Sequence, residues 1–363
     1  MPAYLETRTR LIALTAIAAT LATFALVVAG GPPVATFVVS GVALAALAAM
    51  VGDGTDQLSA RLGPGATGVL QSALGNLPEL FIAVFALQAG LVEVVRSALI
   101  GSILANTLLV LGLAFMAGGL RHGVQKFGSG QTRMMSMLLV LAVAAMVIPT
   151  VAALPGGPDY GHEKEISVVV SIVLLVVFAA SIPFSIGAGS RHHVGETAGI
   201  VPEGKVWPVW LALANLALAA AGAALVSERF VDALTPAMQT LGMSQSFAGL
   251  VVVAIAGNAV ENVVGIKAML ADQGDLAVSL ILNSSLQIAL ALTPVLVIGS
   301  MIAGGAALTL IVSPLLATVL ALSALLAALT VIDGESTWLE GLALVGLYVI
   351  VAASVWWGTP IGV

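Results

Sequence analysis

Two glutamates in this sequence are candidates for chemistry, because each lies within a long apolar stretch in the same short pattern. The first copy reads Gly75-Asn76-Leu77-Pro78-Glu79 and the second, 182 positions later, reads Gly257-Asn258-Ala259-Val260-Glu261. At the same offset, Ala86, Ser102 and Leu104 correspond to Ala268, Ser284 and Leu286. A pattern that fixes three positions can arise by chance, but the matched residues after each copy indicate an internal repeat.

The chemistry follows from the cost of an ionised carboxylate at the bilayer centre, which is at least ~2.5–3.5 kcal/mol. Each glutamate therefore needs a cation, a proton or a basic partner. Lys267 is the only basic residue well inside an apolar stretch, and it lies about 9 Å beyond Glu261 along a helix. We do not expect it to neutralise both carboxylates. Two such groups facing one cavity can hold either protons or one divalent cation, which is the basis of cation/proton antiport.

Other polar residues in these stretches could complete a site for a hard cation. Those that follow the two motifs are Ser102, Asn106, Ser284, Ser285 and Gln287. Ca²⁺ takes six to eight oxygen ligands, so we expect both glutamates as ligands, with Asn76 and Asn258 or freed backbone carbonyls supplying more. The apolar stretches hold no His or Cys to favour a softer transition metal, although Mn²⁺ stays open. For the Asn and Ser residues, the alternative role is hydrogen bonding and close packing between helices.

The composition places these motifs in a membrane. Only 30 of the 363 residues are charged, or 8% against roughly 25% in soluble domains, and 60% are hydrophobic. A soluble globule cannot bury that much apolar surface. The composition therefore excludes a soluble enzyme, a nucleic-acid binder and a disordered protein, and it predicts an all-α polytopic membrane protein. The absence of cysteine excludes disulfides and thiolate chemistry.

Apolar runs broken by Gly, Pro and charge predict eleven membrane helices. Their ranges are 11–29, 34–62, 66–88, 92–118, 133–154, 166–187, 206–226, 246–270, 274–299, 304–330 and 338–357. The first run is longer than a signal-peptide core, so we read it as a helix. Eight basic residues fall on the connections that include the amino terminus and three on the other set. We therefore expect a cytoplasmic amino terminus and an external carboxyl terminus, in a bacterial plasma membrane.

The repeat and the helix count together predict an inverted architecture. We expect an amino-terminal helix at 1–32, a first repeat at 33–187, a cytoplasmic linker at 188–205 and a second repeat at 206–363. Because each repeat holds five spans, the second copy enters the membrane from the opposite side, as in many secondary transporters. Such folds place the site near the midplane, where helices are interrupted. Pro78 predicts an interruption in the first motif, and Gly75 and Gly257 loosen the backbone at the same level.

Two further carboxylates and a histidine pair leave their roles open. Asp56 precedes the first motif, and Glu228 follows the span expected at 206–226. Both are expected near helix ends, where they are either solvated or form a relay that passes cations or protons to the site. His192 and His193, in the expected linker, are either a solvated pair or a regulatory metal site.

Both motifs, and the segments 101–106 and 284–290, resemble the calcium/proton exchangers, a family of the calcium/cation antiporter superfamily. The resemblance covers nearly the whole chain and implies a Ca²⁺/H⁺ antiporter that works by alternating access. It implies that Glu79 and Glu261 bind the cation and protons, that Asn76 and Asn258 line the site, and that Asn106 and Gln287 shape it. Leu77-Pro78 is closer to the sodium/calcium exchanger branch, and Asn262 stands where the family often has His. These departures bear on ion selectivity.

Other functions are weighed against this one. A Na⁺/Ca²⁺ or other cation exchanger shares the fold, but Asn rather than a second acid at 76 and 258 leaves less charge for several Na⁺ ions. A cation channel would conduct without coupling to the pH gradient. An intramembrane hydrolase needs a nucleophile or metal-held water, and no His or Asp set lies at this depth, so we do not expect an enzyme. We expect Ca²⁺ and H⁺ as substrates, no cofactor, no nucleic-acid partner, and the lipid bilayer as surroundings.

Overall fold

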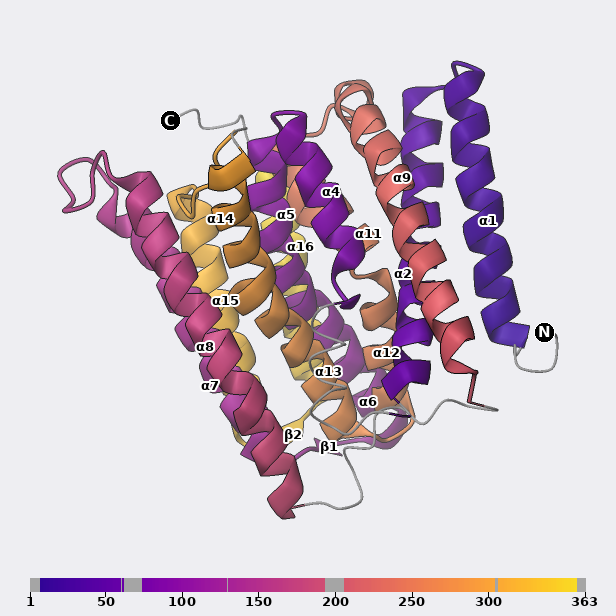
Figure 1. Ribbon diagram of the computed structural model, residues 1–363. Coiled ribbons are helices and arrows are strands. Elements are labelled where there is room, and N and C mark those ends of the chain that lie inside the picture. Colours follow the sequence, from indigo (N-terminus) through magenta and orange to yellow (C-terminus); the bar gives the residue numbers. More distant parts are fainter. Residues whose placement is uncertain are drawn as a thin grey trace. The chain divides into compact units, whose positions relative to one another are not determined.

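The protein is almost entirely helical, which confirms the predicted fold class. The computed structural model describes residues 7–59, 61, 74–128, 130–192, 206–303 and 306–357. The chain forms two compact units, and each is built from segments that are distant in sequence (Figure 1). Unit 1 comprises Met1–Phe85 and Val177–Gly242, and unit 2 comprises Ala86–Val176 and Met243–Val363.

Unit 1 contains three long helices that lie side by side (Figure 1): α1 (Thr7–Val28), α2 (Pro33–Ser59) and α9 (Val209–Leu241). It also contains most of α4 (Leu77–Gln88). Small residues let α2 and α9 approach closely, because a Cβ atom added at Gly54 would lie only 2.8 Å from Leu216. Further along the same pair, the rings of Phe37 and Phe230 stack with their centroids 4.7 Å apart.

Unit 2 holds the remaining helices, several of which include a π-helical turn. Their bounds are α5 (Val92–Leu104), η1 (Ala105–Val110), α6 (Leu111–His122), α7 (Gly130–Ala152), α8 (Glu163–His192, to Val176 in this unit), α10 (Gln245–Phe247), η2 (Ala248–Val253), α11 (Ala254–Gly257), α12 (Ala259–Leu270), α13 (Gly274–Gln287), η3 (Ile288–Leu292), α14 (Thr293–Ala303), α15 (Pro314–Ile332) and α16 (Trp338–Trp356). The backbones of α5 and η2 touch at Gly101 and Gly249, where a Cβ would overlap the carbonyl oxygens of Leu250 and Val94.

A short antiparallel pair of strands joins two connections at one end of unit 2. β1 (Gln125–Lys126) follows α6, and β2 (Glu335–Ser336) follows α15. The Lys126 ammonium lies 3.3 Å from the Glu335 carboxylate, and the N–H of Phe127 donates to the carbonyl of Gly334 at 2.7 Å. The pair links the two connections through backbone hydrogen bonds, while the exposed ion pair adds little to stability.

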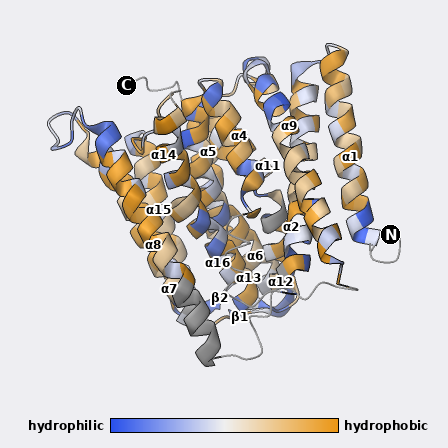
Figure 2. Ribbon diagram, viewed as in Figure 1, coloured by the Kyte–Doolittle hydropathy of each residue, from blue (hydrophilic) through white to orange (hydrophobic). Residues whose placement is uncertain are grey.

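The helices have the length and apolar surface that a bilayer requires. Within the described residues, nine helices are long and apolar enough to cross a membrane, and a bent pair, Gln245–Gly257 with Asn262–Leu270, makes a tenth. Apolar residues cover the helix bodies, and polar residues gather mainly towards their ends (Figure 2). The span expected at 66–88 falls partly outside the described residues, and its described part is the shorter α4. The total of eleven spans therefore stays a prediction.

The helix expected at 304–330 begins ten residues later, at Pro314. Ser313 caps this helix by accepting a hydrogen bond from the N–H of Leu316, and proline is well tolerated at a helix start. The preceding residues 306–313 are not helical. Hydroxyl groups of neighbouring helices satisfy three of their N–H groups: Ser300 accepts from Leu308, Ser167 from Leu310 and Thr150 from Val312. Non-helical backbone within a membrane protein requires such partners.

Candidate cation-binding site

The second motif lies at a break in the helix, as predicted from Gly257. α11 ends at Gly257 and α12 begins at Ala259, with Asn258 between them at φ −93° and ψ 15°. The helical segments before and after the break are bent by 60°. A break of this kind frees carbonyl groups at the end of one half-helix and N–H groups at the start of the next. Discontinuous helices with these exposed termini form the ion sites of many transporters.

In the first motif, which lies in unit 1, the structure describes a turn and the helix that follows it. Gly75 and Asn76 form a turn, and α4 begins at Leu77, with Pro78 in its first turn, where a missing N–H costs no hydrogen bond. The N–H of Leu80 donates to the carbonyl of Asn76 at 3.0 Å. Glu79, the third residue of α4, is only 9% exposed, and a carboxylate in this position is favoured by the positive end of the helix dipole.

Glu261 occupies the equivalent position, because it is the third residue of α12. Its side chain lies outside the part of the chain that the structure describes. The structure thus gives both glutamates the same place in the backbone, one in each unit. That the two carboxylates share one cavity stays a prediction.

The side-chain carbonyl oxygen of Asn258 has a fixed orientation, because the amide nitrogen of the same side chain is held by hydrogen bonds. Its side chain is fully buried, and its Nδ2 donates to Ser102 Oγ at 2.9 Å and to the carbonyl of Ala254 at 3.0 Å. Since a carbonyl can only accept, the amide nitrogen must face Ala254. The buried Oδ1 then points elsewhere and accepts no hydrogen bond from the described residues. A free amide oxygen is a suitable ligand for Ca²⁺.

Asn262, which departs from the family pattern, supplies a second such oxygen. It lies one residue after Glu261, and its N–H donates to the carbonyl of Asn258 at 3.1 Å. Its Oδ1 is buried and, among the described residues, has no donor. Four residues apart on a helix place two side chains on the same face. Asn258 and Asn262 therefore flank the position of Glu261.

The polar residues after each motif are paired across helices. Asn106, in η1, donates through Nδ2 to Ser284 Oγ of α13 at 2.9 Å, and both side chains are buried. With the Asn258–Ser102 bond, this pairing brings together four of the predicted residues. Ser285 instead donates to the carbonyl of Ile281 in its own helix at 3.3 Å, and Gln287 is buried at the end of α13.

π-helical turns, which the sequence did not predict, follow these residues. η1 begins at Ala105 and η3 at Ile288, which are 183 positions apart, within one residue of the repeat offset. Wide π-helical turns inside membrane helices are frequent at functional sites. The matched sequences after each motif indicated that these segments correspond, but the apolar residues in them gave no sign of a wider turn.

The flanking charged residues are placed differently from one another. Asp56 lies near the end of α2, as expected, one turn after Asp53, whose carboxylate lies 3.7 Å from Arg8. The helix end predicted near Glu228 is wrong, because α9 continues to Leu241 and holds this residue in its interior. The side chain of Glu228 is 44% exposed and pairs with Arg229 at 3.0 Å. The adjoining Arg229–Asp232 pair, three residues apart, supports helix through this charged segment.

The structure also places Lys267 and part of the histidine pair at 192–193. Lys267 is exposed in the last turn of α12, so it lies near a helix end and not well inside a span. A lysine there is favoured by the negative end of the helix dipole. His192 is the last residue of α8, and His193 lies outside the described residues.

The chain is similar to known proteins in both sequence and fold. The family model described as "Sodium/calcium exchanger protein" matches residues 32–187 and 211–357. The "Ca(2+)/H(+) antiporter" of Synechocystis sp. is 34% identical, over 87% of this chain and 89% of that protein. The "Ca(2+)/H(+) antiporter ChaA" of Bacillus subtilis is also 34% identical, over 88% of this chain and 92% of that protein. The structure of native YfkE matches with a TM-score of 0.81 and 31% identity, covering 95% of this chain and 99% of that one.

Proposed function

The chain belongs to the sodium/calcium exchanger protein family, and we propose that it is a secondary active antiporter that exchanges Ca²⁺ for H⁺. One observation carries the proposal: two matching motifs each place an asparagine directly before a helix and a glutamate as the third residue of that helix. The relatives named Ca²⁺/H⁺ antiporters, aligned over most of their length, support the choice of ions.

The cation site combines carboxylate and amide oxygens. Glu79 and Glu261 together offer up to four oxygens, and the free Oδ1 atoms of Asn258 and Asn262 offer two more. Asn76 and the carbonyl groups at the break after Gly257 complete the six to eight oxygens that Ca²⁺ takes. The Asn258–Ser102 and Asn106–Ser284 bonds hold the helices around the site in position.

Proton coupling follows from the same two carboxylates. When Ca²⁺ leaves, the two glutamates lose their counter-ion, and two like charges in one low-dielectric site favour taking up protons. The cation and the protons therefore occupy the site alternately. A site with two ionised carboxylates and no cation is unstable, and so is a site that holds Ca²⁺ and protons at the same time. Access alternates between the two sides of the membrane, and Asp56 is a candidate relay on the way.

Two observations support the inverted repeat behind this mechanism. One family model matches two separate segments, 32–187 and 211–357, which supports two related halves of the chain. In each half, the described residues place an asparagine directly before a helix, a glutamate as the third residue of that helix and, further along the chain, a π-helical turn. With five spans to a half, we propose that the halves are inverted in a bacterial plasma membrane, with the amino terminus in the cytoplasm.

Transport into inside-out vesicles tests the proposal. In Na⁺-free buffer, a pH gradient with an acidic vesicle interior is expected to drive Ca²⁺ uptake, because protons leave as Ca²⁺ enters. A protonophore is expected to stop this uptake. Glu79→Gln and Glu261→Gln are each expected to abolish uptake, since a neutral amide can neither balance Ca²⁺ nor release a proton. Glu165→Gln, at an exposed position in the first turn of α8, serves as the matched control and is expected to transport normally.

The same assay separates the alternatives. The Leu77-Pro78 sequence favours sodium/calcium exchange as a second candidate, and uptake that requires a Na⁺ gradient and ignores the pH gradient would establish it. Passive Ca²⁺ flux that depends on neither gradient would indicate a channel. Normal uptake by Glu79→Gln or Glu261→Gln in correctly inserted protein would remove the proposed site.

A further inference from the structure

In unit 1, helix α9 carries charged residues beside an apolar hairpin. The hairpin consists of α1 and α2, which are mainly apolar along their bodies and meet at a turn around Gly30 (Figure 1, Figure 2). At its other end, Arg8 of α1 lies 3.7 Å from Asp53 of α2. The uncharged run 11–28 of α1 lies between these ends and is about 27 Å long. This length matches the hydrocarbon core of a bilayer, so we expect the hairpin to span that core.

The contacts between α2 and α9 place charged residues of α9 at the depth of this hairpin. The two helices are antiparallel, because residues early in α2 touch a residue late in α9. The ring of Phe230 stacks on Phe37, and a Cβ atom added at Gly41 would lie 3.5 Å from the ring of Phe230. Glu228, two residues before Phe230, is therefore level with Val42. That level is about 13 Å along α2 from its first residue.

The surface of α2 at this level is apolar. Val38 and Val42 are 55% and 49% exposed in the isolated chain. Exposed apolar side chains at this depth of a membrane hairpin are expected to face acyl chains. We therefore expect hydrocarbon around unit 1 at the level of Glu228.

The charged residues of α9 at this level are not buried. The guanidinium of Arg229 lies 3.0 Å from the carboxylate of Glu228 and 3.1 Å from that of Asp232, which leaves one negative charge in excess. The side chains of Glu228 and Asp232 are 44% and 61% exposed. A charge exposed to hydrocarbon is costly, so charged residues within membrane spans generally face a water-filled cavity or the interior of the bundle.

A buried hydroxyl beside these residues also indicates water. The side chain of Ser227 is fully buried, and its Oγ has no hydrogen-bond partner among the residues that the structure describes. Buried polar groups of this kind are commonly satisfied by ordered water. By contrast, Ser40 in the facing part of α2 donates to the carbonyl of Phe37 at 2.9 Å.

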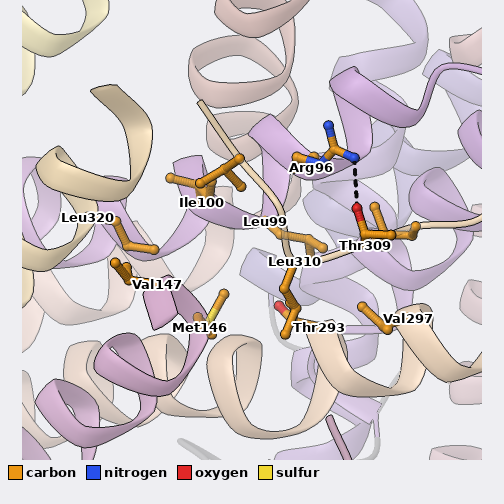
Figure 3. Close-up of a pocket in the computed structure, with 12 residues that line it drawn as sticks. Arg96, Leu99, Ile100, Met146, Val147, Thr293, Val297, Thr309, Leu310 and Leu320 are labelled. Carbon is orange, nitrogen blue, oxygen red and sulfur yellow. Dashed lines mark hydrogen bonds between the residues drawn. The ribbon is translucent and has the colours of Figure 1, made fainter. Parts of the chain in front are cut away.

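Unit 2 accommodates an arginine near a helix start in a different way. The guanidinium of Arg96 donates to Glu93 at 2.8 Å and to Thr309 at 3.3 Å (Figure 3). This ion pair has no excess charge, and the side chains of Arg96 and Glu93 are only 21% and 27% exposed. The group around Arg229 differs in both respects, so it is the group that requires water.

We propose that Glu228 and Asp232 line a water-filled vestibule beside α9, and that their excess negative charge draws hydrated divalent cations from the solution into it. A charged, water-filled cleft with apolar surroundings raises the local concentration of counter-ions. By the distribution of basic residues, the vestibule opens on the outer side, where α1 meets α2. The attraction of cations rests on the proposed antiport, whereas the presence of water does not.

Thiol labelling in right-side-out membrane vesicles tests for water, because the chain has no cysteine of its own. Glu228→Cys is expected to react readily with a charged, membrane-impermeant methanethiosulfonate added outside. Val42→Cys, at the same level on α2, is the matched control. It is expected to react about 100-fold more slowly, because the charge of the reagent would have to enter hydrocarbon. Asp232→Cys and Val38→Cys, one turn further out on the same helices, form a second pair in case Glu228→Cys fails to fold.

Each outcome of the labelling decides the question. Fast labelling at 228 or 232 with slow labelling at the matched position 42 or 38 supports the vestibule. Slow labelling at both positions of a pair would overturn it, since the carboxylates would then face lipid. Fast labelling at both positions would overturn it as well, since this level would then lie outside the hydrocarbon core.

Ca²⁺ uptake from each side tests the attraction of cations. Glu228→Gln is expected to raise the Ca²⁺ concentration for half-maximal uptake by about two- to fivefold in right-side-out vesicles and to leave it unchanged in inside-out vesicles. Glu165→Gln, at an exposed position of α8, is the control and is expected to match the wild type on both sides. An equal rise on both sides, or no rise, would overturn this part. Absence of pH-driven uptake in the wild type would refute the antiport, while the labelling would still decide whether the vestibule exists.

Discussion

Replacing Ser102 with alanine tests whether the orientation of Asn258 sets cation affinity. The hydroxyl of Ser102 accepts from Asn258 Nδ2 at 2.9 Å, and both side chains are buried. Without it, the amide keeps only its bond to Ala254, and one buried donor hydrogen is left without a partner. Such a loss costs about 1–3 kcal/mol.

The expected effect on Ca²⁺ affinity is smaller than this loss, because the bond exists in both the loaded and the empty protein. Ca²⁺ affinity changes only by the share of this free-energy cost that comes from holding Oδ1 of Asn258 in place for the cation. With one of two restraints retained, we expect about 1–1.4 kcal/mol, which is a five- to tenfold rise in the Ca²⁺ concentration for half-maximal uptake. The remainder should appear as a lower melting temperature in detergent.

The assay is pH-driven Ca²⁺ uptake over a range of Ca²⁺ concentrations. Ser136→Ala is the matched control, because among the described residues this buried serine of α7 bonds only to the carbonyl of Arg133 in its own helix. Its half-maximal concentration should not change. Ser102→Ala should add nothing further to Asn258→Ala, since the hydroxyl acts through that amide. A full additional loss in the double variant would refute the reasoning, as would an unchanged affinity in Ser102→Ala.

Three further predictions concern protons, packing and capping. Because protons and Ca²⁺ compete for the same carboxylates, the Ca²⁺ concentration for half-maximal uptake should rise as pH falls. The rise should be up to about tenfold per pH unit for each competing proton. A half-maximal concentration that stays constant between pH 8 and 6 in uptake assays would contradict this competition. Gly101→Val should lower the free energy of unfolding by about 1–3 kcal/mol or more, because its side chain would overlap the backbone of η2; Gly346→Ala, which meets nothing within 4 Å, is the control for melting in detergent. Thr337→Ala should cost about 1 kcal/mol, because it removes the capping box with Glu340 at the start of α16, and an unchanged melting temperature would show that the cap is dispensable.

The sequence predicted the parts of this fold that depend on composition and on local backbone preference. The apolar runs located the helices, and Gly257 located the break, because both signals lie in consecutive residues. The charged residues after 226 were read as the end of a span, whereas α9 continues for fifteen further residues. A helix can extend past the bilayer surface when paired charges favour it, and a hydropathy pattern records only where the apolar part stops.

Partnerships between distant residues could not be read in this way. Asn258 and Ser102 are 156 residues apart, and Asn106 and Ser284 are 178 residues apart. The sequence predicted that these residues are polar members of one region, but which of them bond depends on helix packing. The free oxygen of Asn262 was missed for the same reason.

The non-helical residues 306–313 have a consequence for biogenesis. Three of their N–H groups donate to hydroxyls of Ser167 and Thr150, which lie 143 and 162 residues earlier in the chain, and of Ser300 on the preceding helix. α7 and α8 are synthesised long before this segment, so their hydroxyls enter the bilayer before the backbone N–H groups that they will bind have been made. Once the segment has been synthesised, it can be buried only where those three hydroxyls are already positioned to accept its hydrogen bonds. Its burial should therefore be a late event in assembly, and errors in placing α7 or α8 would halt maturation at this point.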